Sequence, residues 1–161
     1  MPRAITNTSP LIYLHRIGAI EWLPNLFEEV WTPEAVAHEL REGLRLQADS
    51  PDPSTLPWLQ VMEPSKAPSE WLSSDLGPGE LAAIALGLEH PTRLVILDDA
   101  LARRTAQAAG LKVWGTLRVV LEAKSQGVTD KATPWVDRLA HAGLWFSDDI
   151  RQRILRLAGE T

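Results

Sequence analysis

Two adjacent carboxylates, Asp98 and Asp99, follow a short run of apolar residues at positions 94–97 and precede a helical pattern. The apolar run is typical of a buried strand. An aspartate at such a junction either accepts a backbone N–H at the start of the helix or binds a divalent cation at the edge of an open α/β sheet, where the strands end. The residue types at this position are compatible with both uses.

Three further oxygen-bearing side chains occupy comparable positions. Asn7 ends a short extended segment near the N-terminus, and Glu39 lies on a helix that begins after a Thr-Pro-Glu start signal. Glu80 falls in the first turn of an alanine-rich and leucine-rich helix. Because parallel strands end at one edge of their sheet, we expect Asn7 to lie near Asp98 and Asp99. Glu39 and Glu80 would be supplied there by the neighbouring helices.

Several carboxylates in one place repel one another unless they are protonated or bound to a cation, and oxygen ligands suit Mg²⁺ or Mn²⁺. Zinc is less favoured, because the chain has no cysteine and its histidines lack the spacing of a helical ligand pair; these are His15, His38, His90 and His141. Structural roles stay open as well: Asn7 as a helix cap, Glu39 as a solvated helix residue, and Glu80 as a partner of the positive helix end.

Strands that alternate with helices of about ten residues must position these side chains, and this pattern predicts an α/β fold: a central parallel sheet of four to five short strands flanked by helices. Strands are expected at 3–7, 29–31, 58–62, 93–97 and 111–114. Helices are expected at 11–20, 21–27 (interrupted by Pro24), 33–44, 78–89, 100–109 and 116–126, with two C-terminal helices within 133–158. Residues 45–70 contain five prolines and are expected to be irregular within a single domain, 1–161.

The composition is that of an ordinary globular protein, with 45% hydrophobic and 23% charged residues, which argues against disorder. No signal-peptide pattern is present and no apolar run approaches the ~18 residues of a membrane span. We therefore expect a soluble, cytoplasmic protein. The net charge of −5 argues against a large non-specific nucleic-acid surface. The seven tryptophans are scattered, which favours packing in the core or at an interface over base stacking.

The ordered set of motifs resembles a PIN domain, in the branch known as the domain of unknown function 3368. The motifs that carry the resemblance span nearly the whole chain: NTSPLIYL at 7–14, TPEAVAHEL at 32–40, GPGELAAIAL at 77–86, ILDDALAR at 96–103, GLKVWGTL at 110–117 and AGE at 158–160. The resemblance implies a metal-dependent ribonuclease fold of the kind used by toxins of bacterial and archaeal toxin–antitoxin pairs. It also implies a homodimer and a small antitoxin protein as partner.

Carried over position by position, the family's first acid falls on Asn7, the second on Glu39, the third on Glu80 and the fourth on Asp98 or Asp99. The resemblance therefore implies a Mg²⁺- or Mn²⁺-dependent endoribonuclease in which these residues bind the cation and the acids among them are catalytic. The departure is Asn7, because an amide offers a neutral oxygen where the active members usually have aspartate. The alternative is a catalytically weakened module that acts through protein or nucleic-acid binding.

Candidate substrate contacts flank the acids. Thr8 and Ser9 follow Asn7 directly, and Arg103 lies one helical turn after the aspartate pair. Arg103 or Arg104 would contact a phosphate, although a salt bridge between Arg103 and Asp99 is an alternative. A phosphorelay receiver or phosphatase is disfavoured, because such folds need their acid pair early in the sheet with a lysine downstream.

Overall fold

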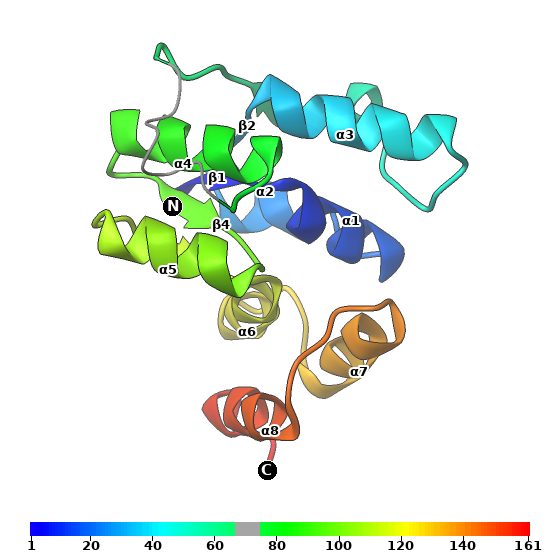
Figure 1. The fold of residues 1–161 in the computed structure, drawn as a ribbon. Helices are drawn as coiled ribbons and strands as arrows, with labels where there is room; N and C mark the ends of the chain where they lie inside the picture. The colour runs from blue at the N-terminus through cyan, green and yellow to red at the C-terminus, as the bar shows by residue number, and fades with distance from the viewer. Residues whose placement is uncertain (67–74) are drawn as a thin grey trace.

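A computed structural model describes residues 1–66 and 75–161. Its centre is a five-stranded, wholly parallel sheet in the order β3-β2-β1-β4-β5 (Figure 1). The α/β prediction with a parallel sheet is therefore confirmed. The strands are β1 (Arg3–Thr6), β2 (Glu29–Thr32), β3 (Leu59–Val61), β4 (Leu94–Ile96) and β5 (Val113–Trp114).

Side chains alternate between the two faces of the sheet, as strand geometry requires. Ala4, Leu94 and Ile96 join one buried cluster, whereas Ile5 and Val95 join another. Both central strands are thus buried on both faces, which is why they read as continuous apolar runs rather than as an alternating pattern.

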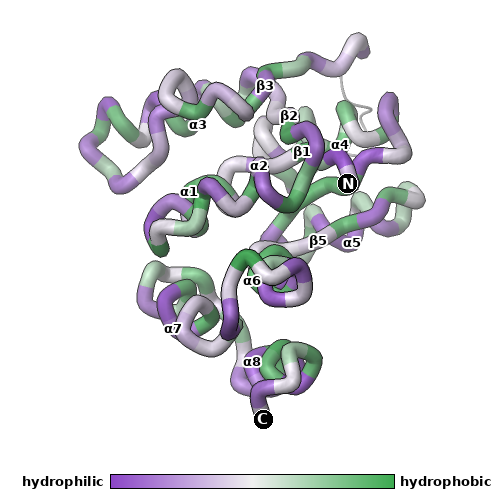
Figure 2. Tube along the Cα trace, turned by 180° about the vertical axis from the view of Figure 1, so that it is seen from behind, coloured by the Kyte–Doolittle hydropathy of each residue, from purple (hydrophilic) through white to green (hydrophobic). Residues whose placement is uncertain are grey.

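Helices cover both faces (Figure 1). Helices α4 and α5 contribute to the cluster that contains Ile5, and α1, α2 and α6 contribute to the cluster that contains Ala4. Helices α7 and α8 lie outside α6, at the C-terminal end of the molecule (Figure 2). The bounds are α1 (Thr8–Arg16), α2 (Trp22–Leu26), α3 (Glu34–Arg45), α4 (Pro78–Glu89), α5 (Ala100–Ala108), α6 (Thr116–Ser125), α7 (Thr133–His141) and α8 (Asp148–Leu157).

Two expected helices differ in detail from the structure. The first was expected to continue to residue 20 but ends at Arg16, because Gly18 adopts a left-handed φ of 78° that ends a right-handed helix. The second is not interrupted, because Pro24 lies in the first turn of α2, where its missing N–H has no helical acceptor. The segment 45–70 contains a short 3₁₀-helix, Pro53–Thr55, and β3; residues 67–70 lie outside the described residues.

The order of the strands creates a switch point beside β1. The chain passes from β1 outward to β2 and β3, and then returns to add β4 and β5 on the other side of β1. In open parallel sheets, the crevice at the carboxyl ends of such a strand pair is where ligands bind. Here the pair is β1 and β4, which end at Thr6 and Ile96 in matching register.

No helix within residues 1–66 and 75–161 has both the length and the apolar character needed to cross a membrane.

The C-terminus is fastened to the start of α7. Glu160 accepts hydrogen bonds from the backbone N–H groups of Ala132 (2.7 Å) and Thr133 (2.9 Å), and it forms an ion pair with Lys124 (2.7 Å). Burial alone would raise the pKa of Glu160, but these donors outweigh it and lower the pKa to about 2. The ionised carboxylate therefore stabilises the fold.

Replacing Glu160 with Gln should lower the free energy of unfolding at pH 7 by roughly 2 kcal/mol, because charge-assisted hydrogen bonds are lost. The depressed pKa means that this stabilisation is present above about pH 4.5 and declines as the pH falls toward 2. Urea unfolding at several pH values measures it, with the exposed Asp130→Asn as control. A pH-independent difference between wild type and Glu160→Gln would contradict the assignment.

Candidate functional site

Asn7 is the first residue after β1, and its side-chain oxygen is buried with no hydrogen-bond donor in the part of the chain that the structure describes. Its backbone N–H donates to the carbonyl of Ile96 at 3.1 Å, which pins it beside the end of β4. The residue is 6% exposed, and Oδ1 has no hydrogen-bond partner among residues 1–66 and 75–161. Asn7 occupies the N-cap position of α1, but its side chain makes no capping bond. The proposed role of Asn7 as a helix cap is therefore wrong for its side chain, and an oxygen that ordinarily requires a donor is left unpaired.

Glu39 projects from α3 toward the same point. Glu39 is exposed, as the alternative of a solvated helix residue expects, but its Oε2 also accepts a 2.7 Å hydrogen bond from the hydroxyl of Thr8. A Cβ built on Gly79 would lie 2.6 Å from Glu39 Oε1 and 3.1 Å from Asn7 Oδ1. The two oxygens thus approach the backbone of α4 together, at a point where only glycine leaves room.

Glu80 combines a structural contact with electrostatic coupling to the other acids. Its Oε1 accepts the N–H of Gly77 at 3.1 Å, just before α4 begins. Burial raises the pKa of Glu80 above its usual value; the Gly77 hydrogen bond opposes that shift, and the charges of Asp99 and Glu39 add to it. The carboxylates are close enough to repel one another, which is the condition that a bound cation relieves.

Asp99 caps α5 and also faces these side chains. Its Oδ2 accepts the N–H of Ala102 at 2.9 Å, as expected for an aspartate at a helix start. It lines a pocket of about 350 Å³, which we call the acidic pocket. The residues that line it are Asn7, Thr8, Ser9, Ile12, Glu39, Gly77, Gly79, Glu80 and Asp99.

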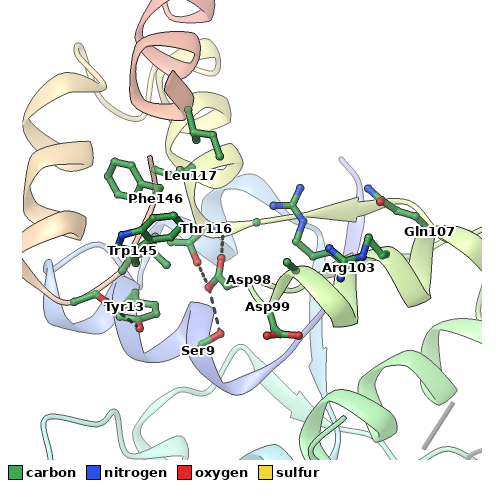
Figure 3. Close-up of a pocket in the computed structure, with 16 residues that line it drawn as sticks. Ser9, Tyr13, Asp98, Asp99, Arg103, Gln107, Thr116, Leu117, Trp145 and Phe146 are labelled. Atoms are coloured by element: carbon green, nitrogen blue, oxygen red, sulfur yellow. Dashed lines mark hydrogen bonds between the residues drawn. The ribbon is translucent and has the colours of Figure 1, made fainter. Parts of the chain in front are cut away.

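Asp98 points elsewhere. Its Oδ1 accepts the N–H of Thr116 at 2.8 Å, and its Oδ2 accepts the hydroxyls of Thr116 (2.7 Å) and Ser9 (3.2 Å) (Figure 3). These bonds fasten β4 to the starts of α6 and α1. Asp98 lines a second pocket of about 680 Å³, which Asp99 also lines. Of the two aspartates, only Asp99 lines the acidic pocket.

The donor chemistry of the acidic pocket fits a hard divalent cation. Carboxylate and amide oxygens are the ligands that Mg²⁺ and Mn²⁺ prefer. Among the described residues, no three His, Cys, Asp or Glu side chains form a group that could by itself hold a metal ion. The convergent oxygens here come from one amide and one carboxylate, Asn7 and Glu39, with Glu80 and Asp99 as the further anionic groups of the pocket.

The side chains that were predicted to contact substrate differ in their contacts. The two hydroxyls are hydrogen-bonded to acids, whereas the arginines form no ion pair with the described residues. Thr8 and Ser9 donate to Glu39 and Asp98, so their hydroxyls orient the acids. Neither Arg103 nor Arg104 forms an ion pair with any residue that the structure describes, so the alternative salt bridge to Asp99 is absent there. Their contact with substrate stays a prediction.

Sequence reasoning did not single out Gly79 or Thr116. A glycine in the first turn of a helix is a detectable signal, because glycine is a poor helix former and its presence suggests a close approach. The Thr116 contact with Asp98 gives no local signal, because the two residues meet only through the pairing of β4 with β5.

Comparison with known families finds a match that covers almost the entire chain. The DUF3368 model, described as a PIN domain, matches residues 3–160. No curated protein matches the chain.

Gly79→Ala should disturb the acidic pocket while the fold persists. The new Cβ would displace the carboxylate of Glu39, which is the end of a flexible side chain, so we expect a shift in melting temperature of only a few degrees. We expect the affinity for Mn²⁺, measured by calorimetry, to fall about 10-fold or more. Gly77→Ala is the matched control, because its Cβ would have only an ordinary 3.7 Å contact. Equal affinities in the two variants would argue against a cation at this point.

Proposed function

The chain belongs to the PIN-domain family, in the DUF3368 branch, and from that premise we propose that it is a Mg²⁺- or Mn²⁺-dependent endoribonuclease. RNA phosphodiester bonds would be hydrolysed at the acidic pocket. The observation that carries the proposal is the buried Oδ1 of Asn7, which accepts no hydrogen bond from any described residue and lies with Glu39 Oε1 at a point that only glycine at position 79 leaves open. Such an oxygen is compensated when a cation binds to it.

Each residue of the pocket has a defined part in the proposal. Asn7 and Glu39 would hold the cation, and Thr8 keeps the Glu39 carboxylate turned toward it through a 2.7 Å hydrogen bond. Glu80 and Asp99 supply further negative charge. When bound, the cation lowers the pKa of a water molecule and neutralises charge that develops on the phosphodiester.

Asp98 would act as a positioning residue, since its oxygens are committed to Thr116 and Ser9. By fixing the starts of α1 and α6, it holds two walls of the site in place. This division supports Asp99, rather than Asp98, as the aspartate that would lie near the cation.

The neutral Asn7 also favours a second candidate function. With an amide in place of the usual first aspartate, the pocket holds one fewer negative charge, and cation affinity falls with ligand charge. A catalytically weakened module would then act through protein or nucleic-acid binding. A small antitoxin partner, a homodimer and a cytoplasmic location are proposed from the family alone.

Glu39→Gln should reduce Mn²⁺-dependent cleavage of RNA by roughly 100-fold or more, because a charged ligand becomes neutral at the reacting centre. The control is Glu42→Gln, a change on the same helix at an exposed carboxylate that pairs with Arg45. A cleavage assay with a labelled oligoribonucleotide measures both. The enzymatic proposal would fail if Glu39→Gln cleaved as fast as Glu42→Gln.

Asn7→Asp should increase both Mn²⁺ affinity and cleavage rate, because a carboxylate replaces a neutral amide oxygen. In EDTA the same change should lower the melting temperature, since it adds a negative charge near Glu39, whereas Mn²⁺ should reverse the loss. Asn25→Asp on the exposed side of α2 is the control. Cleavage gained by Asn7→Asp would count against the binding-module alternative; if the variant gained neither affinity nor cleavage, the cation site itself would be contradicted.

A further inference from the structure

The second pocket adjoins the acidic pocket, because Ser9 and Asp99 line both. It is also larger, at about 680 Å³ against 350 Å³. Its walls differ in chemistry: Figure 3 places Trp145 and Phe146 on one side and Arg103 and Gln107 on the other, with Asp98 between them. The pocket therefore presents an aromatic wall and a cationic wall within reach of the same carboxylates.

Trp145 forms the most exposed part of the aromatic wall. It is 84% exposed, so it does not pack in the core, one of the two sites expected for the tryptophans; packing at an interface stays a prediction. Its neighbours Leu144 and Phe146 pack against the main hydrophobic cluster, and Leu144 N–H donates to the carbonyl of Leu139. Ser147 then caps α8. Because the chain is anchored on both sides of Trp145, the indole ring is held outward, as a ring that packs on a ligand would be.

The cationic wall comes from α5. Arg103 and Arg104 both line the pocket, and within residues 1–66 and 75–161 neither is neutralised by an ion pair. An Nη atom of Arg103 lies 3.2 Å from the position that a Cβ on Gly115 would occupy, so its guanidinium lies beside another residue that lines the pocket. Two unpaired cations close to a group of carboxylates suit a ligand that carries phosphates.

We propose that the second pocket binds an unstacked base of single-stranded RNA, with the indole of Trp145 stacked on the base and Arg103 and Arg104 bound to the adjoining phosphates. This inference rests on the proposed function and names the residues of this chain that would hold the substrate beside the acidic pocket. Aromatic rings and cations that follow a backbone are the two elements of single-strand binding. In a duplex the bases are already paired and stacked, so they do not reach the ring. The shared wall at Asp99 places the bound nucleotide next to the phosphodiester in the acidic pocket.

The test is the binding of a fluorescein-labelled uridine hexanucleotide to the full chain, measured by anisotropy in EDTA, where metal-dependent cleavage is absent. Trp145→Ala should weaken binding about 5- to 100-fold, because base–aromatic stacking is lost. Trp145→Phe should retain most of the affinity, since a phenyl ring also stacks. Leu157→Ala, at a 62% exposed leucine on α8, is the matched control and should bind as wild type does.

The arginines have a separate readout. Arg103→Gln combined with Arg104→Gln should weaken binding and flatten its dependence on salt, because two phosphate contacts are removed. Arg153→Gln combined with Arg156→Gln, at two exposed arginines on α8, is the charge-matched control. An RNA duplex of the same length should be insensitive to Trp145→Ala.

The inference is overturned if the wild type does not bind the hexanucleotide, or if Trp145→Ala binds it as tightly as wild type. It is also overturned if Trp145→Ala instead changes the sedimentation coefficient of the chain from dimer to monomer without a change in affinity, since the ring would then contact a second copy. Failure of the nuclease proposal looks different: the wild type would bind the hexanucleotide through Trp145 yet leave it intact in Mn²⁺.

Discussion

The parallel pairing of β1 with β4 is the constraint on which the candidate site depends. The register that sets Thr6 opposite Ile96, with the Asn7 N–H donated to the Ile96 carbonyl, brings the residues that follow both strands to one edge of the sheet. Helices α1, α5 and α6 begin at this edge, so their positive ends offset part of the repulsion between the acids. The fold thus brings the carboxylates close together, and the positive helix ends at the same edge reduce the repulsion between them.

The acids differ in how many hydrogen bonds they accept from the protein, and they fall into two groups on this basis. Asp98 is saturated by Thr116 and Ser9 and joins elements of the fold, whereas Glu39 and Asp99 each accept only one of the hydrogen bonds described and line the acidic pocket. Asn7 stands apart from both groups, because its side-chain Oδ1 accepts no hydrogen bond from any residue that the structure describes. A bound cation would give the side-chain oxygen of Asn7 a partner at the point where Gly79 leaves room. The glycine in the first turn of α4 is therefore needed for the cation to bind there.

Local patterns in the sequence predicted the strands, most helices and the edge at which the acids meet, because strand burial and helix starts are local properties. They did not separate Asp98 from Asp99, since the direction of each side chain depends on the backbone at the junction and on Thr116, which is distant in sequence. The absence of a capping bond at Asn7 and the contact of Glu39 with Gly79 depend on how α1, α3 and α4 pack together. The exposure of Trp145 was missed for the same reason, because an isolated tryptophan looks the same in a core and on a surface.

The most direct test of the central claim is anomalous X-ray diffraction from crystals of the wild-type chain grown or soaked with Mn²⁺. The account predicts a manganese peak within about 2.0–2.6 Å of Asn7 Oδ1 and a Glu39 carboxylate oxygen, the range for direct oxygen ligands. A peak bound to Asp98 instead, or a fully occupied Mn²⁺ elsewhere with the acidic pocket empty, would contradict it.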